Sequence, residues 1–189
     1  MILRWLTQRA DTSRKAKELY GSVVTAARQP AFYESLGVPD TPEGRFELVA
    51  LHLFLALEAL RGKGPAAEGL VRRTIEAFVI DMDDCMREMG VGDLTVPKKV
   101  KRAAAAFYER AASYRRGLAE AGSPELSKTL RGYVYGGSAE RESDAAGLAV
   151  YMQAASTALS DHAFDVFVND GVASQVLASA TAKRKVSTT

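Results

Sequence analysis

The sequence has few of the residues that disulfides and most metal sites require. Its 189 residues include a single cysteine and two histidines. One cysteine excludes an internal disulfide, and it also excludes zinc or iron–sulfur sites built from several thiolates. Two histidines are too few for a histidine-rich metal centre. We therefore expect no metal and no other cofactor, and we expect a protein of a reducing compartment.

The sequence also lacks a strong net charge and a long hydrophobic run. Lys and Arg number 25 and Asp and Glu 23, so the net charge is +2, which argues against a general nucleic-acid binder. The most hydrophobic stretch, Leu48–Leu57, is interrupted by His52 and is about half as long as a bilayer requires. The opening residues 1–6 are too short and too soon charged for a signal peptide. We expect a soluble, cytoplasmic protein.

The residues that remain favour helices almost throughout. Alanine is frequent, β-branched alternation is nearly absent, and Gly and Pro lie between periodic segments. The patterning predicts an all-α, single-domain bundle of about six to seven helices. We predict a short segment over 1–10, a helical domain over 11–180 and a disordered tail over 181–189. The expected helices span about 11–28, 43–61, 66–89, 96–121, 124–133, 143–162 and 163–180, with an irregular stretch over 29–42.

The helix over 43–61 is predicted to be the central one. Thr41 is placed to cap its N-terminus, with Pro42 at the first helical position and Glu43 near the positive end of the dipole. From Phe46 to Leu60 it is apolar on nearly every face. Because it is too short to span a membrane, the interpretation is a helix buried in the middle of the bundle.

The helix over 66–89 carries an apolar stripe rich in methionine. The stripe residues recur at steps of three and four, which places them on one helical face. A buried stripe is the common interpretation, and an exposed groove that receives an apolar partner helix is the alternative. The residues are Val71, Ile75, Phe78, Met82, Met86 and Met89.

A charge contrast separates two neighbouring segments. Six carboxylates and three arginines give residues 71–93 a net charge of −3, whereas seven cations and one glutamate give residues 96–118 a net charge of +6. Four of the cations lie at the predicted start of a helix, where the helix dipole disfavours them. Either an external anionic partner binds there or the basic segment neutralises the acidic one. The four are Lys98, Lys99, Lys101 and Arg102.

The sites that might support catalysis have simpler interpretations. Asp81–Asp84 superficially resembles the acidic motif of cyclase-type terpene enzymes, but a solvated helix face with an Asp83–Arg87 pair at i,i+4 is favoured. His52 lacks the Glu three residues before it that a di-iron bundle needs, so we interpret it as a hydrogen-bonded core residue. Cys85 is interpreted as a structural thiol. No acid–base pair or nucleophile–base set is present, so we expect a protein that is not an enzyme.

Two stretches of the chain resemble a known family. The first runs from Phe32 through the segment Val38-Pro39-Asp40-Thr41 to His52, and the second from Asp81 to Leu94, followed by Lys98-Lys99-Val100 and Phe107-Tyr108. Together they are similar to the ubiquinol–cytochrome c chaperones, assembly factors of respiratory complex III. The similarity covers roughly residues 20–114. The residues taken as the family motif are Val38, Pro39, Asp40, Thr41, Gly44, Arg45, His52, Gly90 and Gly92.

The resemblance implies a non-enzymatic chaperone that binds newly made cytochrome b and promotes assembly of the complex. It also implies a small partner chaperone and contact with the ribosome, and the absence of a transit peptide is as expected for a bacterial member. Membrane contact at the inner membrane is expected to be peripheral. The residues expected to bind partners are Asp83, Asp84, Arg87, Asp93, Lys98, Lys99, Lys101 and Arg102.

Two further features bear on this interpretation. Ile2, Leu3, Trp5 and Leu6 are apolar residues that, with Arg4 and Arg9, match a short interfacial anchor. The competing function is a helical DNA-binding regulator, which should open with a compact helix-turn-helix and a basic recognition helix. Residues 11–62 fit that pattern poorly, and we expect no specific DNA binding. A helical quinone-pathway enzyme is the third class, and it lacks a catalytic constellation.

Overall fold

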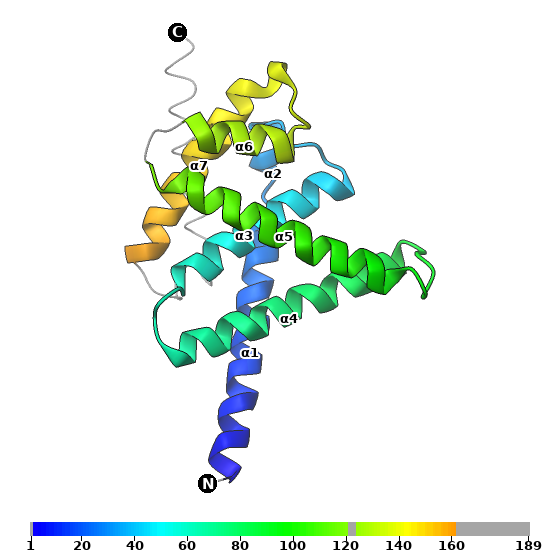
Figure 1. The fold of residues 1–189 in the computed structure, drawn as a ribbon, viewed down its shortest axis with the longest axis vertical. Coiled ribbons are helices and arrows are strands. Elements are labelled where there is room, and N and C mark those ends of the chain that lie inside the picture. Colours follow the sequence, from blue (N-terminus) through cyan, green and yellow to red (C-terminus); the bar gives the residue numbers. More distant parts are fainter. Residues whose placement is uncertain (1, 121–123, 162–189) are drawn as a thin grey trace. The chain divides into compact units, whose positions relative to one another are not determined.

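The computed structural model describes residues 2–120 and 124–161, and the side chains of residues 10–120 and 124–159. These residues form α-helices and one 3₁₀ turn, and no strand occurs among them (Figure 1). The all-α prediction is therefore confirmed. The helices are α1 (Ile2–Ala27), α2 (Pro30–Glu34), α3 (Pro42–Ala59), α4 (Pro65–Glu88), α5 (Val96–Leu118), α6 (Pro124–Val134) and α7 (Glu142–Asp161), with η1 (Ala139–Arg141) before α7.

Two boundaries differ from those expected. Helix α1 begins at Ile2 and not near residue 11, because residues 2–10 contain neither glycine nor proline and nothing interrupts the helix. The stretch over 29–42 is not irregular throughout, since it contains α2, which has Pro30 in its first turn. The helix and tail predicted over 163–189, and His162, lie outside the described residues. The predicted division into residues 1–10, 11–180 and 181–189 stays a prediction.

The chain divides into two compact units. Unit 1 comprises the chain up to Gly21 together with Leu60–Glu109, and unit 2 comprises Ser22–Ala59 together with the chain from Arg110 onward. Each unit is built from two separate stretches of sequence. The boundaries fall inside α1 and inside α5, so these two continuous helices each supply residues to both units.

Unit 1 contains the first part of α1, all of α4 and the first part of α5. Tyr20 and Phe78 meet edge to face with ring centroids 6.3 Å apart, and Phe78 lies 5.6 Å from Phe107. The Tyr20 hydroxyl donates a hydrogen bond of 2.7 Å to Asp81 on α4. Aromatic contacts therefore join α1, α4 and α5 within this unit.

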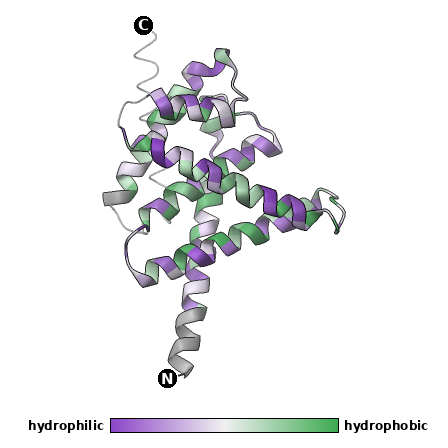
Figure 2. Ribbon diagram, viewed as in Figure 1, coloured by the Kyte–Doolittle hydropathy of each residue, from purple (hydrophilic) through white to green (hydrophobic). Residues whose placement is uncertain are grey.

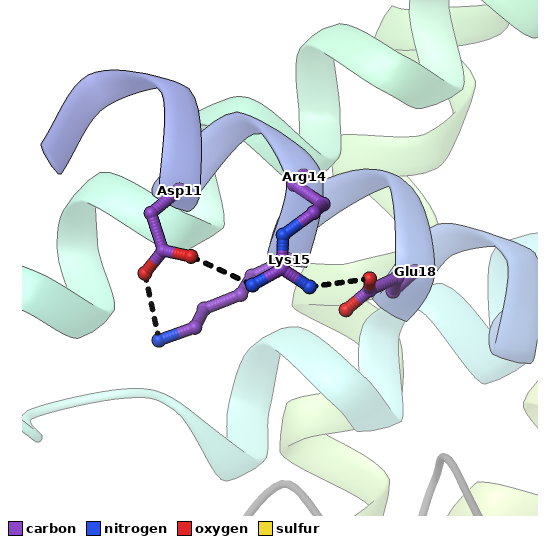
Figure 3. A network of polar contacts seen from close by, with 4 residues as sticks. All are labelled: Asp11, Arg14, Lys15 and Glu18. Carbon is purple, nitrogen blue, oxygen red and sulfur yellow. Dashed lines mark hydrogen bonds and ion pairs between the residues drawn. The ribbon is translucent and has the colours of Figure 1, made fainter. Parts of the chain in front are cut away.

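The exposed face of α1 neutralises its own charges. Arg14 contacts Asp11 at 2.7 Å and Glu18 at 2.8 Å, and Lys15 contacts Asp11 at 3.0 Å (Figure 3). These are i,i+3 and i,i+4 pairs along one helix. The hydrogen bonds from Lys15 and Arg14 lower the pKa of Asp11. The charged side chains of this face therefore pair with one another.

Unit 2 contains the apolar helix α3, which packs against α6 and α7. Ten of its residues are buried, including Leu48, Leu51 and Phe54. The α5 portion of this unit approaches α6 closely, since a Cβ on Gly117 would lie 2.9 Å from the Leu126 Cα. The prediction that this apolar helix is buried is confirmed.

Candidate partner-binding surface

The turn between α4 and α5 is shaped by its two glycines. Gly90 has φ of +77°, in the left-handed region that favours glycine. The Val91 N–H donates to the Met86 carbonyl at 3.0 Å and the Gly90 N–H donates to the Arg87 carbonyl at 2.9 Å, which is the Schellman pattern at a helix end. The carbonyl of Gly92 accepts from Thr95 at 2.8 Å and opens the next helix. Gly90 and Gly92 thus serve to end α4 and begin α5.

Arg87 holds this turn against α4. Its guanidinium donates to Asp83 at 2.5 Å and also to Asp93, beyond the turn. The predicted i,i+4 pair is confirmed, and the second bond extends it to the turn. Both carboxylates raise the pKa of Arg87, Asp83 first through its hydrogen bond. Asp84, also expected to bind a partner, is exposed.

The four basic residues at the start of α5 form no ion pair with the acidic helix before them among the described residues. Lys98, Lys99, Lys101 and Arg102 are all exposed. Within the described part of the chain, none of the four forms an ion pair. The sequence left two alternatives, an external anionic partner and neutralisation by the acidic segment. The absence of ion pairs at these four residues gives no support to neutralisation.

Large apolar side chains are exposed beside these cations. Leu94 in the turn is 99% exposed, Met89 is 61% exposed and Tyr108 on α5 is 56% exposed. Figure 2 shows hydrophilic and hydrophobic segments close together where α4 and α5 meet their connecting turn. On the predicted methionine stripe, Phe78 is buried and Met82 and Met86 are half-buried. Val71 and Ile75 are also half-buried, so the interpretation of a buried stripe holds only at Phe78.

The first group of motif residues builds the start of α3 in unit 2. The Thr41 hydroxyl accepts a hydrogen bond from the Gly44 N–H at 3.1 Å, so the predicted N-cap is confirmed. A Cβ on Gly44 would lie 2.0 Å from the Pro39 carbonyl oxygen, so only glycine fits. Arg45 contacts Asp40 at 2.7 Å on the surface. Val38 is buried. These residues shape a helix entry.

His52 is a hydrogen-bonded core residue, as predicted. It is fully buried, and its Nδ1 lies 2.7 Å from the Leu48 carbonyl while its Nε2 lies 2.7 Å from the Tyr151 hydroxyl. Because a carbonyl only accepts, Nδ1 carries the proton and Tyr151 donates to Nε2. Burial lowers the pKa of His52 to about 4, so the ring is neutral at physiological pH. Phe32 packs edge to face on the same ring.

The sequence did not identify the buried ion pair between α3 and α5. Arg110 donates to both carboxylate oxygens of Glu47, at 2.6 and 2.5 Å, and its guanidinium lies over the rings of Phe46 and Tyr133. Burial raises the pKa of Glu47 more than Arg110 lowers it. The hydroxyl of Tyr114 is buried with no hydrogen-bond partner among the described residues. The signal available in the sequence was Glu47, a carboxylate that directly precedes the apolar stretch Leu48–Leu57.

Among the described residues, no group of three or more His, Cys, Asp or Glu side chains is arranged to hold a metal ion. The same residues include no helix that is long and apolar enough to cross a membrane.

Comparison with known proteins identifies the family. The family profile described as ubiquinol-cytochrome C chaperone matches residues 34–174. The chain belongs to the ubiquinol-cytochrome C chaperone family. This matched range includes every residue of the predicted motif and of the predicted partner-binding set.

Solved structures support the same conclusion about this member of the ubiquinol-cytochrome C chaperone family. It is similar to the crystal structure of the Cbp3 homolog from Brucella abortus, with 31% sequence identity and a TM-score of 0.77. The similarity covers 90% of this chain and 94% of that chain. Among curated proteins, none matches this sequence.

Proposed function

We propose that the protein is a non-enzymatic assembly chaperone, which binds newly made cytochrome b and promotes biogenesis of the ubiquinol–cytochrome c reductase complex. The observation that carries the proposal is the family match over residues 34–174, with the Cbp3 homolog as the related structure. The proposed partners also include a small partner chaperone and the ribosome. The protein works in the cytoplasm, peripherally at the inner membrane.

The exposed end of α4 supports the binding of an apolar client. Met82 and Met86 are half-buried and Met89 is largely exposed on one flank of the helix. Methionine side chains are unbranched and polarizable, so they adapt to apolar helices of varied shape. The Arg87 bridge to Asp83 and Asp93 keeps this end of the helix ordered. We assign the client-facing role to this methionine flank.

Deleting the gene tests the proposal directly. The levels of cytochrome b and of the assembled complex should fall, because the client lacks its chaperone, and a plasmid copy of the gene should restore both. Normal levels in the deletion strain would overturn the proposal.

The methionine flank has its own test. Met86→Ser with Met89→Ser should reduce the cytochrome b that co-purifies with the chaperone by roughly tenfold, since two apolar contacts are lost. Val150→Ser is the matched control, because Val150 is an exposed apolar residue of unit 2. Equal co-purification by both variants would remove the flank from the client-binding site.

The DNA-binding alternative is examined by a gel shift on random DNA at low and moderate salt. We expect no complex that persists at moderate salt, since nonspecific phosphate contacts weaken steeply with ionic strength. A persistent complex would favour the regulator over the chaperone.

A further inference from the structure

The end of unit 1 formed by the α4–α5 turn carries apolar and basic side chains side by side. Leu94 is almost completely exposed, and Met89 precedes it in the same turn. Four cations follow within eight residues, in the first two turns of α5. We call this set, Met89, Leu94, Lys98, Lys99, Lys101 and Arg102, the hairpin tip.

Three of the four cations of the hairpin tip share one face of α5. Lys98, Lys101 and Arg102 are spaced i, i+3 and i+4, and Lys99 lies about a quarter turn away. The buried residues Val96 and Phe107 lie on the opposite face. Lys98, Lys101 and Arg102 therefore lie on the face away from the core of the unit, Lys99 is also exposed, and all four lie where the helix dipole disfavours positive charge.

Three of the carboxylates near the turn already bind other side chains. Asp83 and Asp93 both bind Arg87, and Asp81 accepts from Tyr20. On α1 the exposed cations Arg14 and Lys15 have carboxylates within 3.0 Å (Figure 3). The basic residues of the hairpin tip differ from these because none has an ion-pair partner within the described part of the chain. Their positive charge is therefore left available to an anionic surface.

We propose that the hairpin tip docks on an anionic lipid bilayer. Lipid phosphates match the four cations, and the headgroup–hydrocarbon boundary accepts Leu94 and Met89, which neither an RNA backbone nor an acidic surface would favour. An anionic bilayer thus offers both a negatively charged layer for the cations and an apolar layer for Leu94 and Met89. This inference rests on the proposed function for its biological meaning, since a chaperone of a membrane protein works beside the membrane.

Vesicle flotation with the purified full-length protein tests the proposal. The protein should float with vesicles of phosphatidylcholine and phosphatidylglycerol, but not with phosphatidylcholine alone, and added salt should weaken binding. The variant K98Q/K99Q/K101Q/R102Q should lose binding on the order of a hundredfold, since each cation near the surface contributes to adsorption. Leu94→Ser should lose roughly tenfold, because its apolar contact with the boundary region is removed.

A second quadruple variant controls for net charge. K17Q/R28Q/K63Q/K128Q removes the same charge from exposed positions outside the hairpin tip. It should bind the anionic vesicles nearly as well as the unchanged protein. Equal loss in both quadruple variants would overturn the proposal, as would equal binding to both kinds of vesicle.

Two further outcomes would assign the binding elsewhere. If Trp5→Ser abolishes flotation while the tip variant floats normally, the N-terminal segment is the anchor and the proposal fails. If the tip variant loses binding to structured RNA but keeps vesicle binding, the tip serves RNA and the proposal fails. Because flotation uses no cytochrome b, its failure leaves the chaperone proposal standing, and normal complex levels after gene deletion would leave a positive flotation result standing.

Discussion

At the scale of single residues, His52 makes the stability of the protein depend on pH. Its pKa is about 4 in the folded protein and near 6.5 when unfolded, so between these values the unfolded state binds more protons. The stability that the neutral ring contributes is present above pH 6.5 and is lost as the pH falls towards 4. Lowering the pH from 7 to 5 should cost about 2 kcal/mol from this group. Urea unfolding at several pH values measures it.

Substitution of His52 tests this prediction. His52→Gln should flatten the loss of stability between pH 7 and pH 5. A slope that survives in His52→Gln would assign the pH dependence to other groups.

Arg110 and Arg115 provide a matched pair of ion-pair residues on the same helix. Arg110 is largely buried with Glu47, and Arg115 is exposed beside Glu58. Arg110→Lys should cost about 2 kcal/mol of stability, because a lysine cannot reproduce the two-point bond or the stacking on Tyr133. Arg115→Lys should cost less than about 1 kcal/mol. Chemical denaturation measures the free energy of unfolding of both variants. Equal losses would contradict the distinction between a buried and an exposed ion pair.

His52 and the Glu47–Arg110 pair show what the sequence could and could not predict about single residues. The role of His52 followed from local pattern, since it lies in an apolar helix and lacks the spacing of a metal ligand. The Glu47–Arg110 pair did not, because its members are 63 positions apart and meet only through the approach of α3 to α5. No periodicity encodes that approach.

At the scale of elements, Gly44 tests how α3 begins. A Cβ at this position would overlap the Pro39 carbonyl, so Gly44→Ala should lower the free energy of unfolding by roughly 3 kcal/mol or more. Gly132→Ala in α6 is the control, because its Cβ would meet open space and alanine favours the helix by roughly 0.5–1 kcal/mol. Thermal and urea unfolding measure both. Similar effects of the two substitutions would mean that the chain relaxes around Gly44.

The elements themselves were largely predictable. The caps and breakers placed α3 and α4 within a residue or two, since Thr41, Pro42 and Gly90 act through local geometry. The stripe of α4 was predictable in spacing but not in burial. Whether Met89 is covered depends on where the neighbouring helix ends. The 3.6-residue period of α4 carries no information about that position.

At the scale of the whole molecule, α1 and α5 each continue from one unit into the other, so we expect them to couple the stabilities of the two units. Phe78→Ala in unit 1 removes contacts to Tyr20 and Phe107 and should cost about 3–5 kcal/mol. Hydrogen exchange should then also rise at Ser22–Ala27, in the part of α1 that belongs to unit 2. A helix propagates through successive backbone bonds, so loss of order on one side spreads along it.

Leu130→Ala, in the core of unit 2, supplies the comparison for this experiment. This substitution also leaves a cavity in a core, and it should raise hydrogen exchange mainly in α6, far along the sequence from Phe78. If faster exchange in Phe78→Ala stops at Gly21, the two units open independently.

The division into units was not predictable from the sequence. Each unit combines two distant stretches, and no linker rich in Gly, Pro or Ser marks a boundary inside α1 or α5. Family membership, in contrast, could be inferred from two ordered motifs, because a resemblance between sequences does not depend on knowing how the helices pack.

The one cysteine of the chain has a practical consequence. Cys85 is half-buried on α4, four residues before Met89 and thus on the same flank of the helix. A maleimide dye would attach at one position only, one helical turn from the hairpin tip, with no competing thiol to remove. Its emission would then report, in real time and on the unaltered backbone, whether that end of the molecule enters a less polar medium.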